Sequence, residues 1–293
     1  MDPDKDDVHP STQQLSVRLA LRSFAPPAPV EKWRMVVQHY ANLSLTNEGD
    51  VFPALQGLAM RMHDECFRTS AYLAGLWEQS IIADLSWYYA LSREKNDLPM
   101  RPQTWRAPSW SWASLKNRSD ETAPTNGHLM WANPATKIEV QQRTLRDHET
   151  LYATYLGASI DPAGESQFGA LSSAKLRLKS RWIEVKLFKR KLYYSAVRNL
   201  KERRWIRSVF DWEIHQDFAW TKVFSAYRLA EGTSLKIVFL GDNESNGSYK
   251  CVGLILRELE DLVYERVGLA TISRATSEIF RVAFAPEDIF EIV

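Results

Sequence analysis

The segment Arg106-Ala-Pro-Ser-Trp-Ser-Trp-Ala-Ser114, with Trp105 directly before it, constrains the fold of this chain more than any other stretch. Its three indole side chains alternate with small residues, and so many indoles are too apolar to leave exposed. We therefore expect the segment to pack into a core. If it is extended, Trp110 and Trp112 share one face, because side chains alternate along a strand.

Two interpretations of these indoles remain open. The first is a strand whose indoles pack against a helix that carries Trp77 and Trp87. The second is an aromatic platform for a sugar or a base, since rings stack on flat ligands. We favour the first, because most large aromatic side chains belong to cores.

The overall composition is that of an ordinary globular protein. Of 293 residues, 45% are apolar and 25% charged, and a formal net charge of +1 gives no general bias towards nucleic acid or membranes. Cys66 and Cys251 are far apart, which argues against a disulfide framework and favours a reducing compartment. No window approaches 18 apolar residues, and the acidic start Met1–Asp7 is unlike a secretory signal. A cytoplasmic protein without a membrane span is expected.

The first hundred residues divide into a tail and a helical region. Residues 1–30 are acidic and then rich in proline, which predicts a disordered segment before a folded part that begins near Glu31. Residues 31–100 show a helical period. We predict helices over Trp33–Tyr40, after an N-cap at Asp50, and from Leu73 to Tyr89.

Residues 101–293 have the period of two that is typical of strands, with a basic insert near 186–207. Predicted strands are 136–143, 174–179, 235–240, 249–257, 263–271 and 279–283. The apolar residues change face near Trp182, which predicts a bulge or break. Turns are predicted at Gly241–Asn243 and at Asn246-Gly247, the latter closing a hairpin. The fold class is therefore α+β, with a helical portion packed on a larger, mainly antiparallel, sandwich- or barrel-like β portion.

Positive charge is concentrated in residues 175–207, which hold thirteen Lys or Arg and two Glu, a net charge of +11. One interpretation is a solvated strand face followed by a basic surface insert. The alternative is a binding module for an anionic polymer, either nucleic acid or anionic lipid. We favour the first. The candidate anion-binding residues are Lys189, Arg190, Lys191, Arg203 and Arg204.

No motif in the chain predicts catalysis. The six histidines have neither the spacing nor the cysteine partners of a metal site. His63 and Cys66 stand three residues apart without an identifiable orienting group, so we interpret them as helix-surface residues. Glycine-rich phosphate loops and nucleophile elbows are absent. We expect no enzyme and no catalytic, cofactor-binding or metal-binding residue, and we interpret Tyr264-Glu265-Arg266 as a source of a cross-strand Glu/Arg pair.

Four blocks of sequence carry a resemblance to a known family. They are Trp33-x-x-Val36-Val37-x-x-Tyr40 with Leu45-Thr46, Asp50 and Ala54-Leu55-x-Gly57-Leu58-Ala59; Tyr72-Leu-Ala-Gly-Leu-Trp77 with Leu85 and Trp87; Arg101-Pro102 with Ala107-Pro-Ser-Trp-Ser-Trp-Ala-Ser114; and Val252-Gly-Leu-Ile-Leu256 with Tyr264-Glu-Arg-Val-Gly268. In this order they resemble the region that follows the HET domain in fungal heterokaryon-incompatibility proteins. The third block is the most specific and the fourth the weakest.

The resemblance implies a role but no reaction. The Ala-Leu-Ser-Tyr-x-Trp-Gly and Trp-x-x-Gln-Glu segments of the HET domain do not occur, so the chain is expected to begin after that domain. By resemblance, such proteins act in fungal non-self recognition and programmed cell death. The expected function is a non-catalytic interaction region whose partners are other protein domains, including a HET effector domain in cis or in trans.

Overall fold

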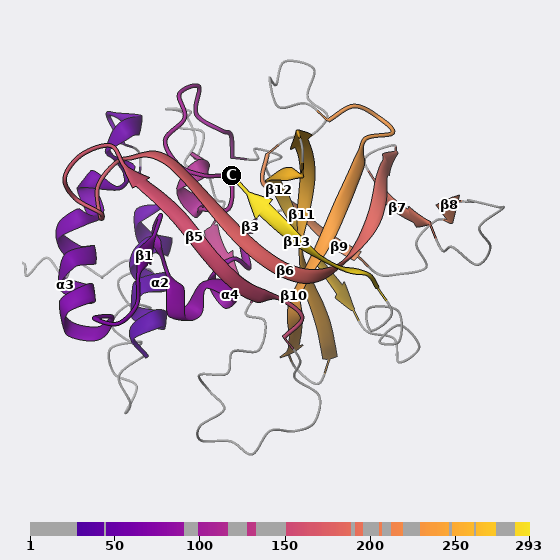
Figure 1. The fold of residues 1–293 in the computed structure, drawn as a ribbon, viewed down its shortest axis with the longest axis horizontal. Helices are drawn as coiled ribbons and strands as arrows, with labels where there is room; N and C mark the ends of the chain where they lie inside the picture. Colours follow the sequence, from indigo (N-terminus) through magenta and orange to yellow (C-terminus); the bar gives the residue numbers. More distant parts are fainter. Residues whose placement is uncertain are drawn as a thin grey trace, which may run out of the picture.

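The structure is a computed structural model of the 293-residue chain. It describes residues 28–43, 45–90, 99–116, 128–132, 151–188, 191–195, 205–206, 212–218, 229–245, 248–260, 262–273 and 285–293. Short helices lie on one side of a much larger, mainly antiparallel β portion, so the α+β class with a dominant sheet is confirmed (Figure 1). The predicted strands 136–143 and 279–283 and most of the N-terminal tail lie outside the described residues.

The first two predicted helices are present with shifted starts. Helix α2 (Pro29–Tyr40) begins at a proline, which suits a first helical position, and it buries Trp33 and Val37. Helix α3 (Gln56–Cys66) follows two 3₁₀ turns, η1 (Glu48–Val51) and η2 (Pro53–Leu55). The N-cap prediction at Asp50 is wrong: Asn47 caps η1, and its side-chain oxygen accepts a hydrogen bond from Gly49 N at 3.1 Å.

The third predicted helix is wrong. Residues 72–90 form a tight hairpin of β1 (Tyr72–Leu73) and β2 (Leu76–Trp77), then η3 (Glu78–Ser80), the single turn α4 (Ile81–Asp84) and β3 (Trp87–Ala90). Ala74 and Gly75, the two hairpin residues, have φ of 49° and 91°, which a right-handed helix excludes. Both faces of the hairpin are buried, so its apolar residues fit the helical period by coincidence.

Among the described strands, five close a ring of pairings. These are β6 (Leu171–Phe188), β10 (Ser234–Ser245), β11 (Ser248–Glu260), β12 (Val263–Ser273) and β13 (Glu287–Ile292). Neighbours pair antiparallel around the ring, except β12 and β13, which are parallel. A closed ring of strands leaves few free edges, and the β portion is therefore barrel-like.

The remaining strands extend this barrel or cover its side. Strand β6 also pairs with β5 (Thr154–Pro162) and β7 (Lys191–Ser195), β7 pairs with β8 (Trp205–Ile206), and β12 pairs with β9 (Trp212–Gln216). Strand β3 pairs with β4 (His128–Trp131) in a separate ribbon. The hairpin of β5 and β6 reaches from the barrel to the helices (Figure 1), where Phe168 contacts the rings of His63 and Tyr72.

Strand β6 explains the predicted change of face at Trp182. Even-numbered residues are buried from Ala174 to Ser180, and Val185 and Leu187 are buried afterwards, so the phase change is confirmed. The strand does not break; its partner changes instead, from β13 along 176–181 to β10 along 182–186.

Of the two turns predicted near the end of β10, one is confirmed and the other is wrong. The predicted hairpin is confirmed by its strands, because Ser245 of β10 pairs with Ser248 of β11, while Asn246 and Gly247 themselves lie outside the described residues. The turn predicted at Gly241–Asn243 is wrong, since those residues continue β10 beyond a register shift.

Candidate interaction site around the tryptophan segment

The tryptophan segment forms a compact turn in the core. Trp110 and Trp112 are 0% and 2% exposed, so the expected burial is confirmed. The expected strand is wrong, because Trp112–Ser114 form the 3₁₀ turn η4, whose N-cap Ser111 accepts a hydrogen bond from Ala113 N at 3.1 Å. The Ser111 hydroxyl, next to Trp112, therefore favours an N-cap of a 3₁₀ turn over a strand at this position.

On the helical side, the segment holds the β1–β2 turn in place. The carbonyl oxygen of Gly75 accepts hydrogen bonds from the indole N–H groups of Trp33, at 2.9 Å, and Trp112, at 3.1 Å. The Ser111 hydroxyl donates to the carbonyl oxygen of Ala74 at 2.6 Å. Three donors from two distant segments thus satisfy the carbonyls of a turn whose residues have positive φ. These bonds stabilise a backbone conformation that is unfavourable for alanine.

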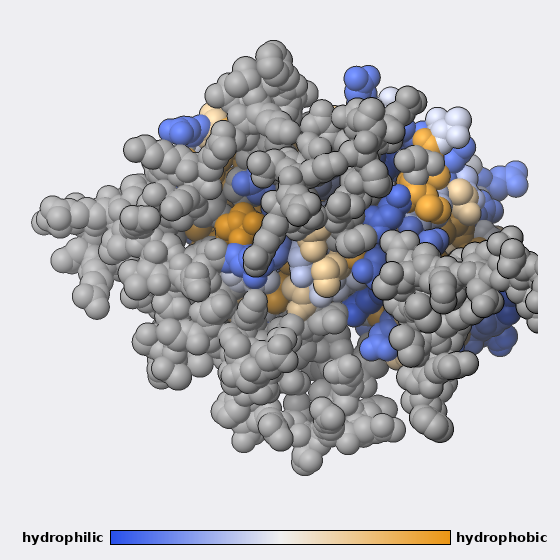
Figure 2. Space-filling view, turned by 180° about the vertical axis from the view of Figure 1, so that it is seen from behind, coloured by the Kyte–Doolittle hydropathy of each residue, from blue (hydrophilic) through white to orange (hydrophobic). Residues whose placement is uncertain are grey.

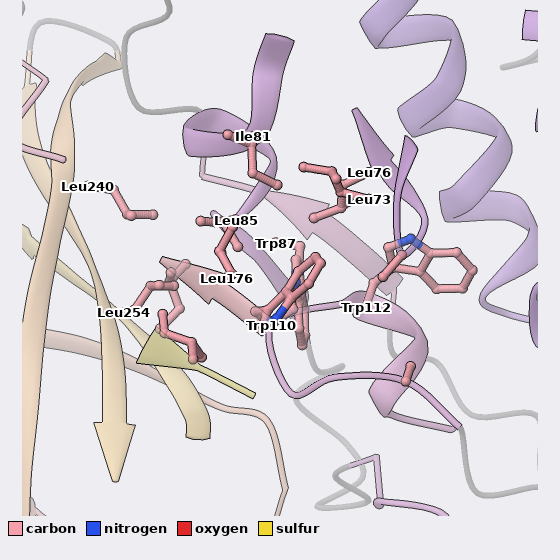
Figure 3. Close-up of a cluster of buried hydrophobic side chains, with 14 of the residues drawn as sticks. Leu73, Leu76, Ile81, Leu85, Trp87, Trp110, Trp112, Leu176, Leu240 and Leu254 are labelled. Atoms are coloured by element: carbon pink, nitrogen blue, oxygen red, sulfur yellow. The ribbon is translucent and has the colours of Figure 1, made fainter. Parts of the chain in front are cut away.

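On the barrel side, the segment is joined to β12, to β3 and to Val293, which directly follows β13. Arg266 N donates to the hydroxyl of Ser109 at 2.8 Å, and Ser109 N donates to the main-chain oxygen of Val293 at 2.9 Å. The indole of Trp87 donates to the carbonyl of Trp110 at 2.8 Å. Figure 3 shows Trp110 and Leu85 between the leucines of the β1–β2 hairpin and those of the barrel. The segment therefore links the two portions of the fold.

Arg266 is the charged centre of this junction and is 0% exposed. Its guanidinium donates to both oxygens of Asp217, at 3.0 and 3.2 Å, and to the carbonyls of Leu85 and Trp87. It also lies over the Trp87 ring, 3.4 Å from the centroid. Burial raises the pKa of the Asp217 carboxyl, while the charge of Arg266 acts in the opposite direction. Such a paired, saturated charge serves packing rather than proton transfer.

The structure brings four of the five predicted tryptophans into one core. Trp77 and Trp87 are both 0% exposed, but they lie on β2 and β3 rather than on one helix. Trp105 is 48% exposed and lies outside this core. The four buried rings contact protein on all sides, so they do not form a platform for a sugar or a base.

Sequence reasoning missed the polar members of the junction, Ser109, Ser111, Asp217 and Arg266. The two serines occupy the small positions between the indoles. The prediction used their small size but not the capacity of their hydroxyls to form hydrogen bonds. The predicted cross-strand Glu/Arg pair does exist, between Glu265 and Arg257. Arg266, next in sequence, points into the core instead, because neighbouring strand residues face opposite sides.

The predicted anion-binding residues are not brought into a described site. Lys189, Arg190, Arg203 and Arg204 lie outside the described residues, and Lys191 is placed only as part of β7. The preceding basic strand face is described: Lys175, Arg177 and Lys179 are exposed. Two of its lysines form ion pairs with β13, Lys175 with Glu291 at 2.7 Å and Lys179 with Glu287 at 2.9 Å. These carboxylates reduce the positive potential of the strand.

A cleft of about 410 Å³ lies where β3 approaches β9. Tyr88 and His215 face each other there, with ring centroids 4.0 Å apart, and Glu213 lies 3.8 Å from the imidazole. Burial, followed by the charge of Glu213, raises the pKa of the Tyr88 phenol. The cleft offers hydrogen-bonding groups from two strands. The lining residues that the structure describes include no Ser, Cys or Lys that would serve as a nucleophile.

The other candidate features of the described residues are a metal site, a Cys–His dyad and a membrane-spanning helix. No group of three His, Cys, Asp or Glu side chains within the described ranges is placed to hold a metal ion. The imidazole of His63 stacks on Trp77 and meets Phe168, while Cys66 is exposed, so they do not form a dyad. None of the helices in the described part is both long and apolar enough to cross a bilayer.

Apolar side chains on the surface come from several elements. Where described residues are visible on the face opposite that of Figure 1, apolar and hydrophilic areas lie side by side (Figure 2). The large apolar side chains that are exposed among the described residues are Met35, Leu43, Leu58, Met60, Met100, Trp105, Met130, Leu156, Leu259, Leu262 and Ile289.

Comparison of the chain with protein-family models, with curated protein sequences and with solved structures gives no significant match.

Proposed function

We propose that the chain is a non-catalytic interaction module of a heterokaryon-incompatibility-type protein, acting in the cytoplasm in fungal non-self recognition. In this role it binds a HET effector domain, in cis or in trans, and restrains or relays the signal that leads to programmed cell death. The proposal rests on the sequence resemblance and on how the residues that carry it are arranged.

One observation supports the proposal best: the four blocks of the resemblance meet in one buried junction. Trp33 of the first block and Trp112 of the third both bind the Gly75 carbonyl of the second. Arg266 of the fourth binds Ser109 of the third and the Trp87 carbonyl of the second. Residues far apart in sequence thus form one hydrogen-bonded unit, as expected for the core of a folded module.

The junction also suits a role in relaying binding. It connects the helices to the barrel through buried hydrogen bonds and a charged pair, and contiguous networks of this kind carry energetic coupling between distant sites. A partner that binds near one end of the segment therefore acts on both portions. Among the aromatic residues whose exposure is described, Trp105, half exposed at the start of this segment, is best placed to contact a partner.

The test is direct binding to a HET effector domain from the same genome. The chain and that domain are purified, and their affinity is measured by calorimetry beside growth arrest on co-expression in a fungal host. Trp105→Ala is expected to weaken binding at least tenfold with the fold intact. Met130→Ala, which removes another half-exposed apolar side chain on the separate β3–β4 ribbon, is the matched control. Absence of binding and of any effect on growth would refute the proposal.

The alternative, a module that binds an anionic polymer through residues 175–207, has weaker support. Two of its lysines already pair with glutamates of β13. This alternative predicts salt-dependent binding of RNA or of phosphoinositide vesicles that charge reversal at Arg203 and Arg204 abolishes. Binding that is absent or independent of salt in the parent chain would eliminate it.

A further inference from the structure

One side chain from each of the five barrel strands meets at the ammonium group of Lys236. Lys236 on β10 lies 4.7 Å from the ring centroid of Trp182 on β6, 4.7 Å from that of Tyr264 on β12 and 5.9 Å from that of Phe290 on β13. Its Nζ donates to the Tyr264 hydroxyl at 2.6 Å and lies 3.4 Å from a carboxylate oxygen of Glu258 on β11.

The walls of this cage are built and mutually supported. Tyr264 and Phe290 are 1% and 0% exposed, and their rings meet edge to face at 5.2 Å. Trp182 meets Phe290 at 6.4 Å with an interplanar angle of 79°. The side chains of Lys236 and Glu258 are 18% and 44% exposed, so the cage opens to solvent on the side of the carboxylate.

This arrangement has the chemistry of an ammonium-binding site. The ammonium meets Tyr264 at its hydroxyl, so the rings of Trp182 and Phe290 are the ones that attract a cation through their quadrupoles. This attraction is strongest where water is excluded, and quaternary ammonium groups are the ligands that aromatic cages favour. The carboxylate of Glu258 adds a counter-charge at the mouth. Burial lowers the pKa of Lys236, but the hydrogen bond to Tyr264 and the charge of Glu258 outweigh it and leave the pKa raised, so the resident group is a cation.

We propose that this end of the barrel is a binding cage for quaternary alkylammonium groups, such as a trimethylated lysine side chain, and that Lys236 is its tethered internal occupant. The tether gives Lys236 a high effective concentration, so an external ligand binds only by displacing it. A quaternary ammonium group cannot donate hydrogen bonds and is weakly hydrated, which lets it exploit the rings where a primary ammonium depends on Tyr264 and Glu258. The cage is independent of the tryptophan segment and of the function proposed above.

The experiment is titration of the folded chain with tetramethylammonium chloride, against sodium chloride at equal ionic strength, followed by calorimetry. Lys236→Ala empties the cage and is expected to bind tetramethylammonium at least tenfold more tightly than the parent chain. Lys236→Met keeps the stem that fills the cage and should bind no better than the parent. Adding Trp182→Ala to Lys236→Ala removes one wall and should abolish the gain. Lys179→Ala, which removes a lysine with a carboxylate partner and no ring around it, is the matched control.

A second measurement uses the parent chain and does not depend on variants that fold. The rate at which an amine-reactive reagent labels Lys236 is read by mass spectrometry beside that of Lys179. Lys236 should react more slowly, and tetramethylammonium should accelerate its labelling selectively. Equal binding by the parent and Lys236→Ala, or labelling of Lys236 that is unaffected by tetramethylammonium, would overturn the proposal.

Discussion

Replacement of Arg266 by methionine tests whether the two portions of the fold depend on one buried charge. The variant keeps an apolar stem but leaves Asp217, which is 2% exposed, without its counter-ion, and the carbonyls of Leu85 and Trp87 without their donor. Removing one partner of a buried pair costs about 3–5 kcal/mol because the remaining charge stays desolvated. Since domains are stable by only about 5–15 kcal/mol, we expect a large loss of stability.

The assay is urea unfolding followed separately by near-ultraviolet and far-ultraviolet circular dichroism. Arg266→Met should lower the free energy of unfolding by about 3–5 kcal/mol. The double variant Arg266→Met with Asp217→Leu removes the isolated carboxylate and should recover about 2 kcal/mol of that loss. Arg61→Met, which breaks an exposed pair with Glu65 on α3, is the control and should leave the free energy of unfolding almost unchanged. A loss below 1 kcal/mol for Arg266→Met, or no recovery in the double variant, would refute the reasoning.

Two further predictions concern the hairpin turn and the basic strand. A Cβ atom at Gly75 would lie 2.6 Å from the Trp112 indole nitrogen, at a φ of +91°. Gly75→Ala should therefore lower the free energy of unfolding in chemical denaturation by about 3 kcal/mol. Gly57→Ala, with open space around it, is the control and should not lower it. The hydrogen bond from Lys179 lowers the pKa of Glu287 below 4.5, so the stabilisation is present above about pH 4.5 and is lost as pH falls through the folded-state pKa. Lys179→Ala should return that pKa towards 4.5 in an NMR titration; an unchanged value would show that the pair does not form in solution.

Local patterns predicted much of the β portion correctly. The alternation in β6 requires only that one face be buried, and that condition is written into neighbouring residues. Strands β10, β11 and β12 are buried on both faces over most of their described side chains, and they were predicted as apolar runs between turn signals. The change of face near Trp182 was likewise visible, because a strand that bends and changes partners reverses its buried side. Closure of the ring through β13 was not predicted, since it depends on pairings between distant segments.

The candidate site was only partly predictable. Burial of Trp77, Trp87, Trp110 and Trp112 follows from their size and apolar character. The turn that contains Trp112 was missed, because a serine hydroxyl that caps a 3₁₀ turn also suits an exposed strand position. Gly75 was the available signal against a helix, since glycine marks turns with positive φ.

The stretch from Leu73 to Tyr89 shows what the sequence determines by itself and what depends on the tertiary structure. Its residues specify that most of it is buried, and periodicity alone then favours a helix. The hairpin forms instead of a helix because Trp33, Ser111 and Trp112, which lie 37 or 42 positions away, donate hydrogen bonds to the Ala74 and Gly75 carbonyls. Arg266 follows the same rule. Its sequence position predicts a cation on the exposed face of a strand, but it is buried because the Asp217 carboxylate and the Leu85 carbonyl, 181 positions away, accept its hydrogen bonds. Local composition decides whether a segment is buried, while the partners that make a strained turn or a buried charge stable exist only once the chain has folded.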